Sequence, residues 1–178
     1  MRIRDRVAVL CLGLTLISSA AGCKLIDQLK ARNHLNHGVS EYTSKKYDSA
    51  AESFTAAIEL DPELVDAYVY LATTYRAQFV PLVQTPENLE MGKRAIATFE
   101  KVLELQPDHR TAMVNIADIY RNMGRPEEAK DWYRRLMEID EDQSEALYGI
   151  GAINYAISHE QTGEDGANVE NLTEEEIA

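Results

Sequence analysis

The sequence predicts an all-α protein in which helical hairpins stack side by side into a solenoid. The main observation is a pattern that occurs three times with internal offsets of 4, 3 and 5 residues. Its three copies are Ala50, Phe54, Ala57, Pro62; then Ala95, Phe99, Val102, Pro107; then Ala129, Tyr133, Leu136, Glu141. Residues at i, i+4 and i+7 share one face of a helix, so each copy predicts a helix with small residues at fixed places. Repeated helices of this kind are typical of stacked repeats.

A second helix precedes each copy, so the repeating unit is a hairpin of helix A and helix B. Helix A has matching spacing in three places: Tyr68, Leu71, Ala72, Tyr75; Met113, Ile116, Ala117, Tyr120; and the half-copy Leu147, Ile150, Gly151. In the first unit the apolar stripe is Leu35, Val39 and Tyr42, with Gly38 as the small residue. That first helix is expected to be rotated relative to the others or to pack on only one neighbour.

Proline and glycine support these boundaries. Pro62 and Pro107 each follow an apolar helix end, where proline cannot continue the hydrogen-bond ladder. Gly124 fits a left-handed residue that closes a helix A, and Pro126 then opens the following helix B. Thr85 is the expected N-cap of the second helix B.

These patterns resemble the tetratricopeptide repeat, whose period is about 34 residues. The third copy begins 34 residues after the second, but the second begins 45 after the first, so the second unit carries an insertion of 11. The resemblance implies a tetratricopeptide repeat domain over 23–158: three helical hairpins plus a C-terminal capping helix. The expected parts are units at about 31–64, 65–109 and 110–143, then the capping helix at 144–158. A bundle of seven unrelated amphipathic helices is the alternative, but a bundle needs no fixed repeat period.

The N-terminus predicts export and a lipid anchor. Residues 1–6 carry three arginines, 7–17 are apolar, and small residues lead to Cys23. This order is typical of a secretory signal peptide over 1–22, and the apolar run is short of the roughly 20 residues that span a bilayer. Ala-Ala-Gly-Cys resembles the lipobox of bacterial lipoproteins, which implies palmitate or other acyl chains on Cys23. The alternative is an ordinary signal peptide cut nearby, with Cys23 a free thiol.

The charge balance is acidic. The chain carries −12, and removing 1–22 takes away three arginines and one aspartate, which leaves −14. Nucleic acid is therefore an unfavourable partner. Basic residues gather just after Cys23, at Lys24, Lys30 and Arg32, and this stretch is expected to rest on anionic lipid headgroups or to be a solvated helix face. Residues 159–178 hold seven acids and no lysine or arginine, which predicts an acidic disordered tail.

No catalytic signature is present, so we expect no enzymatic activity and no cofactor. The sequence has no glycine-rich phosphate loop, no Gly-x-Ser-x-Gly and no His-Glu-x-x-His. His34, His37 and Glu41 lie along one helical face at i, i+3 and i+7, and such a set can bind zinc. The alternative is the exposed face of a terminal helix that no preceding repeat covers.

The resemblance also implies a concave groove lined by the A helices, where partner proteins bind. Its expected residues are Arg32, Asn36, Tyr42, Tyr70, Thr73, Arg76, Asn115, Asp118, Arg121, Asn122, Tyr148 and Tyr155. Repeats that clamp the C-terminal carboxylate of chaperones need Lys, Asn and Arg at five positions. Those positions here are Leu35, Val39, Tyr70, Thr111 and Asn115. Most of the donors are missing, which argues against a carboxylate clamp.

The insertion gives a second candidate surface. Residues 78–84 read Gln-Phe-Val-Pro-Leu-Val-Gln. Exposed apolar loops often mark interaction sites, so Phe79, Val80, Leu82 and Val83 form a candidate docking loop. Alternatively, the loop packs on the ends of its own helices.

Together these features predict a membrane-anchored scaffold in the bacterial cell envelope, facing the periplasm or the cell surface. It resembles the repeat lipoproteins that act as adaptors in envelope assembly, including pilus-secretin pilotins and envelope-protease adaptors. One or more envelope proteins are its expected partners, with a peptide or helix in the groove. The alternatives are a groove that binds a small ligand or cell-wall fragment, and a metal site at His34 and His37.

Overall fold

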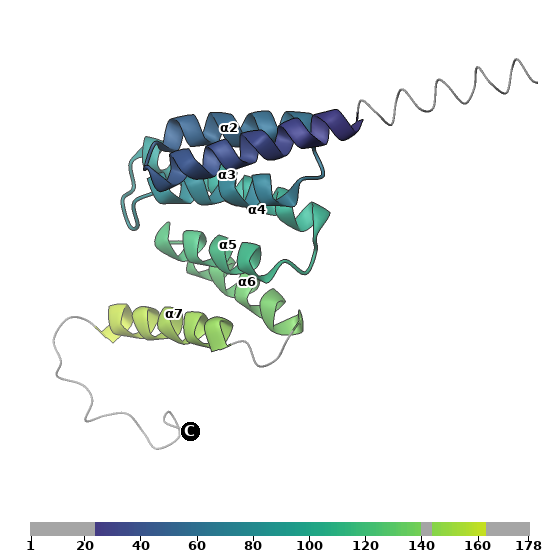
Figure 1. Ribbon diagram of the computed structural model, residues 1–178. Coiled ribbons are helices and arrows are strands. Elements are labelled where there is room, and N and C mark those ends of the chain that lie inside the picture. The colour runs from purple at the N-terminus through teal and green to yellow at the C-terminus, as the bar shows by residue number, and fades with distance from the viewer. Residues whose placement is uncertain (1–23, 140–143, 163–178) are drawn as a thin grey trace, which may run out of the picture.

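The structure is a computed structural model that describes residues 24–139 and 144–162. Within these ranges every regular element is a helix, and the helices stack as the repeat pattern predicts (Figure 1). The first helix covers 24–43. It is followed by α2 (Tyr47–Leu60), α3 (Val65–Gln78), α4 (Pro86–Leu105), α5 (Arg110–Asn122), α6 (Pro126–Ile139) and α7 (Ser144–Thr162). Helix 24–43, α3, α5 and α7 are the A helices, and α2, α4 and α6 are the B helices.

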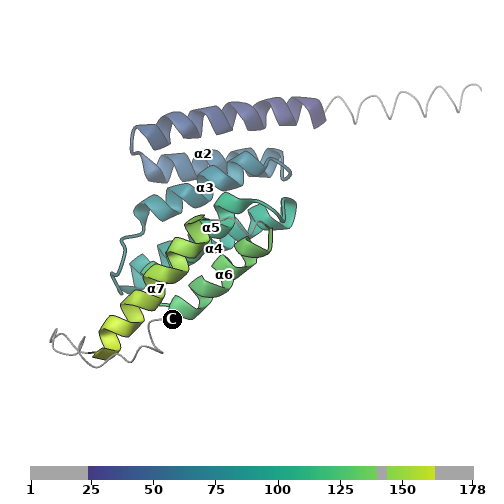
Figure 2. The same cartoon turned by 90° about the horizontal axis from the view of Figure 1, so that it is seen from below.

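The pattern of small and large residues that occurs three times in the sequence forms the core. Its first three members are buried in all three copies: Ala50, Phe54, Ala57; Ala95, Phe99, Val102; Ala129, Tyr133, Leu136. Seen from below, helix 24–43 lies at one edge of the stack, next to α2 and then α3 (Figure 2). Burial of these apolar side chains drives the stacking, because each hairpin alone would leave one face in water.

The first B helix, α2, contributes an aromatic ring that fills the gap between the neighbouring A helices. A Cβ atom built on Gly38 would lie 2.6 Å from the Phe54 ring, so only glycine allows this approach. On its other side the Phe54 ring stacks on Tyr70 of α3, with centroids 5.5 Å apart. The apolar stripe expected for helix 24–43 is confirmed, because Leu35, Val39 and Tyr42 pack against the core.

Helix ends follow the predicted chemistry. The hydroxyl of Thr85 accepts a hydrogen bond from the Asn88 amide at 3.3 Å, which caps α4. Gly124 has a φ of 72°, the left-handed conformation predicted for it, and Pro126 opens α6. α2 and α4 end at Leu60 and Leu105, two residues before the prolines.

The insertion of 11 residues divides between helix and loop. α4 has 20 residues where α2 and α6 have 14, so six of the additional residues lengthen this helix. Most of the remainder lengthens the connection between the helices of the hairpin. Residues 79–85 join α3 to α4, whereas 123–125 join α5 to α6.

Two sequence expectations need correction in α7. Gly151 was expected to provide the close approach, but nothing lies within 4 Å of a Cβ built there. Gly149 provides it instead, since its Cβ would lie 2.3 Å from the Tyr133 ring of α6. The reason is that α7 packs on the hairpin before it, and the described chain has no helix B after α7 for Gly151 to approach. The tail was expected to begin at 159, but α7 continues through Thr162.

Some predicted segments lie outside the described residues. These are the signal peptide at 1–22, the lipid-attachment residue Cys23, the closing position Glu141, and the tail from 163 onward.

The two glycines of α7 give a matched test of the packing. Alanine raises helix propensity by about 1 kcal/mol at either site. Only Gly149→Ala forces a methyl group into the Tyr133 ring, and overpacking of this kind costs about 1–3 kcal/mol. We expect Gly151→Ala to be as stable as the parent or more so, and Gly149→Ala to be less stable than Gly151→Ala, as measured by urea denaturation followed by circular dichroism. Equal stability of the two variants would contradict the close contact.

Candidate partner-binding surface

Three A helices share a small cavity at their carboxyl-terminal ends, and we call this surface the A-helix groove. The cavity has a volume of about 150 Å³. It is lined by Tyr42 of helix 24–43; Thr73, Arg76 and Ala77 of α3; Phe79 and Pro81 of the loop; and Ile119 and Asn122 of α5. Four of the residues predicted for the partner groove therefore meet here: Tyr42, Thr73, Arg76 and Asn122. Sequence reasoning placed them on one face because they occupy equivalent positions in successive A helices.

A network of charges borders the groove. One Asp118 oxygen accepts hydrogen bonds from the Arg121 guanidinium at 2.8 Å and from the Tyr133 hydroxyl at 2.8 Å. The other Asp118 oxygen lies 3.9 Å from the Arg76 guanidinium, at the outer limit of an ion pair. The Arg76 side chain is 43% exposed. Asp118 is therefore committed mainly to Arg121 and Tyr133, and Arg76 keeps hydrogen-bonding capacity toward the groove.

The other predicted residues do not line this cavity. Arg32 and Asn36 are exposed on helix 24–43, and Tyr148 and Tyr155 are exposed on α7. Tyr70 uses one face of its ring to stack on Phe54. The Asn115 amide donates to the Thr111 carbonyl of its own helix at 2.7 Å.

The loop at 79–85 is fixed by one buried side chain that the sequence analysis missed. The Asn88 Oδ1 atom accepts from the Val80 amide at 2.7 Å, and its Nδ2 atom donates to the carbonyls of Val80 and Val83 at 2.8 and 2.7 Å. Asn88 is 8% exposed. The signal available in the sequence was an asparagine at the start of a helix that follows a long loop, where the backbone needs side-chain partners.

The loop also bonds to the end of α5. The Leu82 amide donates to the Asn122 carbonyl at 2.9 Å, and the Gln84 side chain donates to the Met123 carbonyl at 3.3 Å. The insertion therefore bridges the second and third repeats beside the A-helix groove.

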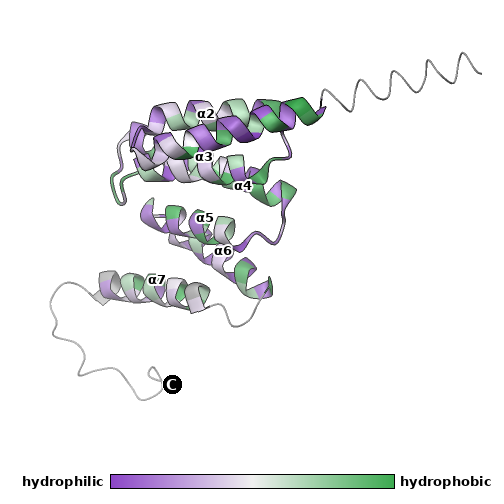
Figure 3. Cartoon of the chain, in the orientation of Figure 1, coloured by the Kyte–Doolittle hydropathy of each residue, from purple (hydrophilic) through white to green (hydrophobic). Residues whose placement is uncertain are grey.

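The candidate docking loop divides into a packed part and an exposed part. Phe79 is 7% exposed and its ring packs beside Gly92, so it belongs to the core, and only its edge lines the A-helix groove. Val80, Leu82 and Val83 are 54%, 73% and 39% exposed. Figure 3 shows this loop in the green of hydrophobic residues. Leu82 has a φ of 64°, a left-handed conformation that is costly for leucine, and its side chain is held in solvent.

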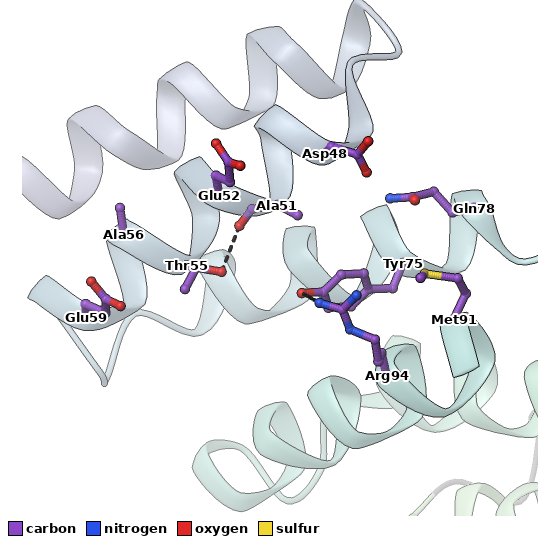
Figure 4. A pocket seen from close by; sticks show the side chains of 10 residues that line it. All are labelled: Asp48, Ala51, Glu52, Thr55, Ala56, Glu59, Tyr75, Gln78, Met91 and Arg94. Atoms are coloured by element: carbon purple, nitrogen blue, oxygen red, sulfur yellow. Dashed lines mark hydrogen bonds between the residues drawn. The ribbon is translucent and has the colours of Figure 1, made fainter. Parts of the chain in front are cut away.

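A larger cavity is lined mainly by α2, with two residues each from α3 and α4 (Figure 4). Its volume is about 380 Å³, and we call it the α2–α4 cavity. Asp48, Glu52 and Glu59 lie along its α2 side. Across from them, the Arg94 guanidinium lies 4.1 Å from the centroid of the Tyr75 ring and donates to the Tyr75 hydroxyl at 2.8 Å. Its rim is thus mostly acidic, and its one arginine is occupied by a neighbouring tyrosine.

The zinc site suggested by His34, His37 and Glu41 is not formed. Among the residues that the structure describes, no group of three or more His, Cys, Asp or Glu side chains is arranged to hold a metal ion. Glu41 instead accepts a hydrogen bond from the Ser53 hydroxyl at 2.6 Å and lies 3.2 Å from the His37 Nδ1 atom. These contacts tie helix 24–43 to α2, and both histidines are otherwise exposed, as on a terminal helix.

Near the α5–α6 connection the pKa of Tyr120 is raised and the pKa of Glu128 is lowered. Burial raises the pKa of Tyr120, although the Arg125 guanidinium over its ring opposes that shift. Hydrogen bonds from the backbone and from Arg125 lower the pKa of Glu128 in the first turn of α6. These interactions stabilise a hairpin and provide no nucleophile paired with a base.

Comparison with known proteins identifies the repeat. Two family models, both described as "Tetratricopeptide repeat", match this chain, one over residues 35–78 and the other over residues 90–152. Together the two matches cover more than half of the chain. The chain belongs to the tetratricopeptide repeat family. Members of this family are in general scaffolds for protein–protein interaction.

Similar proteins share the fold at low identity. A "Protein CTR9 homolog" from Arabidopsis thaliana is 23% identical over 124 residues, which cover 70% of this chain. The chain spans only 11% of the length of that relative. The first tetratricopeptide repeat domain of Spaghetti (RPAP3), solved with the HSP90 peptide SRMEEVD, has a TM-score of 0.61 at 20% identity, and the match covers 74% of this chain and 96% of that domain. A crystal structure of MamA has a TM-score of 0.61 at 18% identity, with 89% and 86% covered.

A membrane-spanning helix needs about 20 consecutive, mostly apolar residues. Among the described residues, none of the helices is both long enough and apolar enough to cross a bilayer.

A carboxylate introduced into the insertion should destabilise the protein at the buried Phe79 but have little effect on stability at the exposed Leu82. Phe79→Asp places a carboxylate against Gly92, so we expect a loss of about 3–5 kcal/mol in the free energy of unfolding. Leu82→Asp changes an exposed side chain and should stay within about 0.5 kcal/mol of the parent. Chemical denaturation measures both. A large loss for Leu82→Asp would mean that this side chain also packs.

Proposed function

We propose that this chain is a lipid-anchored adaptor of the bacterial cell envelope, which holds a peptide segment of another envelope protein in the A-helix groove. The observation that carries the proposal is the convergence of Tyr42, Thr73, Arg76 and Asn122 on one cavity. Tyrosine, arginine and asparagine side chains stack on a peptide and hydrogen-bond its backbone. The proposed role is binding and positioning rather than catalysis.

The charges of the groove favour a partner segment that carries a carboxylate. Arg76 lines the A-helix groove, and Arg121 borders it as the partner of Asp118, whereas the chain as a whole carries −12. Arg76 is the better placed of the two arginines, because its nearest carboxylate is 3.9 Å away and its side chain is 43% exposed. A partner carboxylate would accept from Arg76 a short, charge-assisted hydrogen bond like the one that Asp118 accepts from Arg121.

The insertion supplies an apolar edge to the same groove. Pro81 lines the cavity, and the neighbouring Leu82 is exposed in a conformation that leucine adopts at a cost. Strained residues tend to persist where function needs them. We therefore expect the partner segment to place an apolar side chain near Leu82 and its carboxylate near Arg76.

The chaperone-type peptide is not the proposed ligand. Its clamp would need donors at Leu35 and Val39, and both side chains are partly buried against the core. The solved RPAP3 domain binds an HSP90 peptide. For this chain we propose only that a peptide binds on the corresponding face, the A-helix groove, and not that the peptide is of the chaperone type.

The envelope location rests on the N-terminal sequence. The arginine-containing start, the apolar run and the Ala-Ala-Gly-Cys sequence support a lipoprotein signal with Cys23 as the acylated residue. Acyl chains on Cys23 would hold the repeats at a membrane surface, facing the periplasm or the cell exterior.

The second candidate function is binding of a small ligand or cell-wall fragment. The α2–α4 cavity favours it, because about 380 Å³ falls within the usual range of small-molecule sites. Its acidic rim, with Asp48, Glu52 and Glu59, would select a basic or hydroxyl-rich ligand.

Paired photo-crosslinkers distinguish the two surfaces. Thr73 lines the A-helix groove and Thr55 lines the α2–α4 cavity, and each hydroxyl donates to the carbonyl four residues earlier. A photoreactive residue is placed at either position in the full chain, expressed in its bacterial host, and adducts are identified by mass spectrometry. We expect a protein adduct at position 73 that falls by about tenfold with Arg76→Glu, as for loss of a charged contact.

Two other outcomes count against the adaptor. A protein adduct only at position 55 would place the partner on the wrong face. A glycan or small molecule captured at either position, without a protein adduct, would favour the second candidate.

A further inference from the structure

The first helix begins with an apolar face that the repeats do not cover. Leu25, Ile26 and Leu29 are 59%, 53% and 62% exposed. Ala31 is the first buried residue within the described range 24–43. Figure 3 shows the N-terminal end of this helix in strong green, and Figure 1 shows that end extending past α2. The repeat packing therefore leaves about two turns of an apolar helix in water.

Helix geometry places these three side chains together. At about 100° per residue, Leu25, Ile26 and Leu29 fall within an arc of roughly 100°. Ala31 and Gly38, which are buried, lie on the opposite side of the helix. The exposed apolar face is thus turned away from α2 and cannot be covered by the packing that buries the rest of the helix.

Basic residues border this apolar arc. By the same geometry Lys30 lies at one edge of the arc and Arg32 at the other, and both are exposed. Lys24 is exposed too, but it lies on the side of the helix that faces the stack and pairs with Glu63 at 3.7 Å. Asp27 lies on the opposite side and pairs with Lys30 at 3.7 Å. An apolar stripe with cations at both edges is typical of helices that lie in a lipid interface, where the long side chains reach the headgroups.

The apolar arc ends abruptly along the helix. Asn33, Asn36 and Ser40 continue the same face, and all three are polar and exposed. A protein partner along the helix would be expected to use more than its first two turns. A bilayer surface needs contact only at the N-terminal end of the described helix, next to the cysteine of the lipobox sequence.

We propose that the first two turns of helix 24–43 lie in the headgroup region of an anionic bilayer, with Leu25, Ile26 and Leu29 toward the acyl chains. Lys30 and Arg32, at the two edges of the arc, bind the lipid phosphates. The helix continues without a break from this contact into the repeat stack. The membrane contact therefore sets the orientation of the A-helix groove relative to the bilayer, which an acyl anchor on a flexible linker would not do.

Tryptophan depth probes test the contact on the full chain. Leu29→Trp places a probe in the apolar arc, and Asn36→Trp places a matched control on the same side two turns further on. Both carry Trp132→Phe to remove the chain's single native tryptophan. The purified chain is reconstituted in vesicles of phosphatidylcholine with about one-third phosphatidylglycerol, with and without bromine on the acyl chains.

We expect bromolipid to quench Leu29→Trp at least about twofold more strongly than Asn36→Trp, since only the arc reaches the acyl chains. Adding Lys30→Glu and Arg32→Glu should reduce that quenching in the anionic vesicles. Equal quenching of the two probes, or none of either, would overturn the proposal and leave a protein as the occupant of the face. The intact mass of the same sample reports whether Cys23 is acylated, so failure of the lipid anchor is distinguished from failure of this contact.

Discussion

An aromatic ring from helix B, fitted against a glycine of an A helix, is the contact on which the stack depends. The Phe54 ring fills the space left by Gly38 and stacks on Tyr70 of the next repeat. At the other end, the Tyr133 ring fills the space left by Gly149. Each ring therefore touches two successive A helices and sets their separation. Because interiors pack tightly, a methyl group added at either glycine has no room.

The same spacing creates the binding surface. The Phe54 ring holds helix 24–43 beside α3, and polar positions of these two helices converge with those of α5 on one cavity. Tyr133 serves both roles, because its ring packs on Gly149 while its hydroxyl binds Asp118 at the edge of the groove. The core thus orients the charge network that leaves Arg76 open to a partner.

The regular part of the fold could be predicted from the sequence, and the irregular part could not. Ala50, Phe54 and their counterparts repeat because every hairpin meets the same packing demand, so spacing alone identified them. Gly149 was missed because the described neighbours of α7, α5 and α6, both belong to the hairpin before it, whereas the repeat pattern assumes a neighbour on each side. Phe79 was assigned to a docking loop because local sequence does not reveal the hydrogen bonds by which Asn88 folds the insertion back. Four of the predicted groove residues line the cavity. Whether the other predicted residues contact a partner depends on how far the partner extends beyond the cavity.

Hydrogen–deuterium exchange on the chain with its crosslink-identified partner tests the central claim that the A-helix groove is the binding surface. The account predicts slower amide exchange in the carboxyl-terminal halves of α3 and α5 and in the loop at 79–85, with α2 and the outer face of α4 unchanged. Slower exchange confined to α2 and α4, around the α2–α4 cavity, would contradict it.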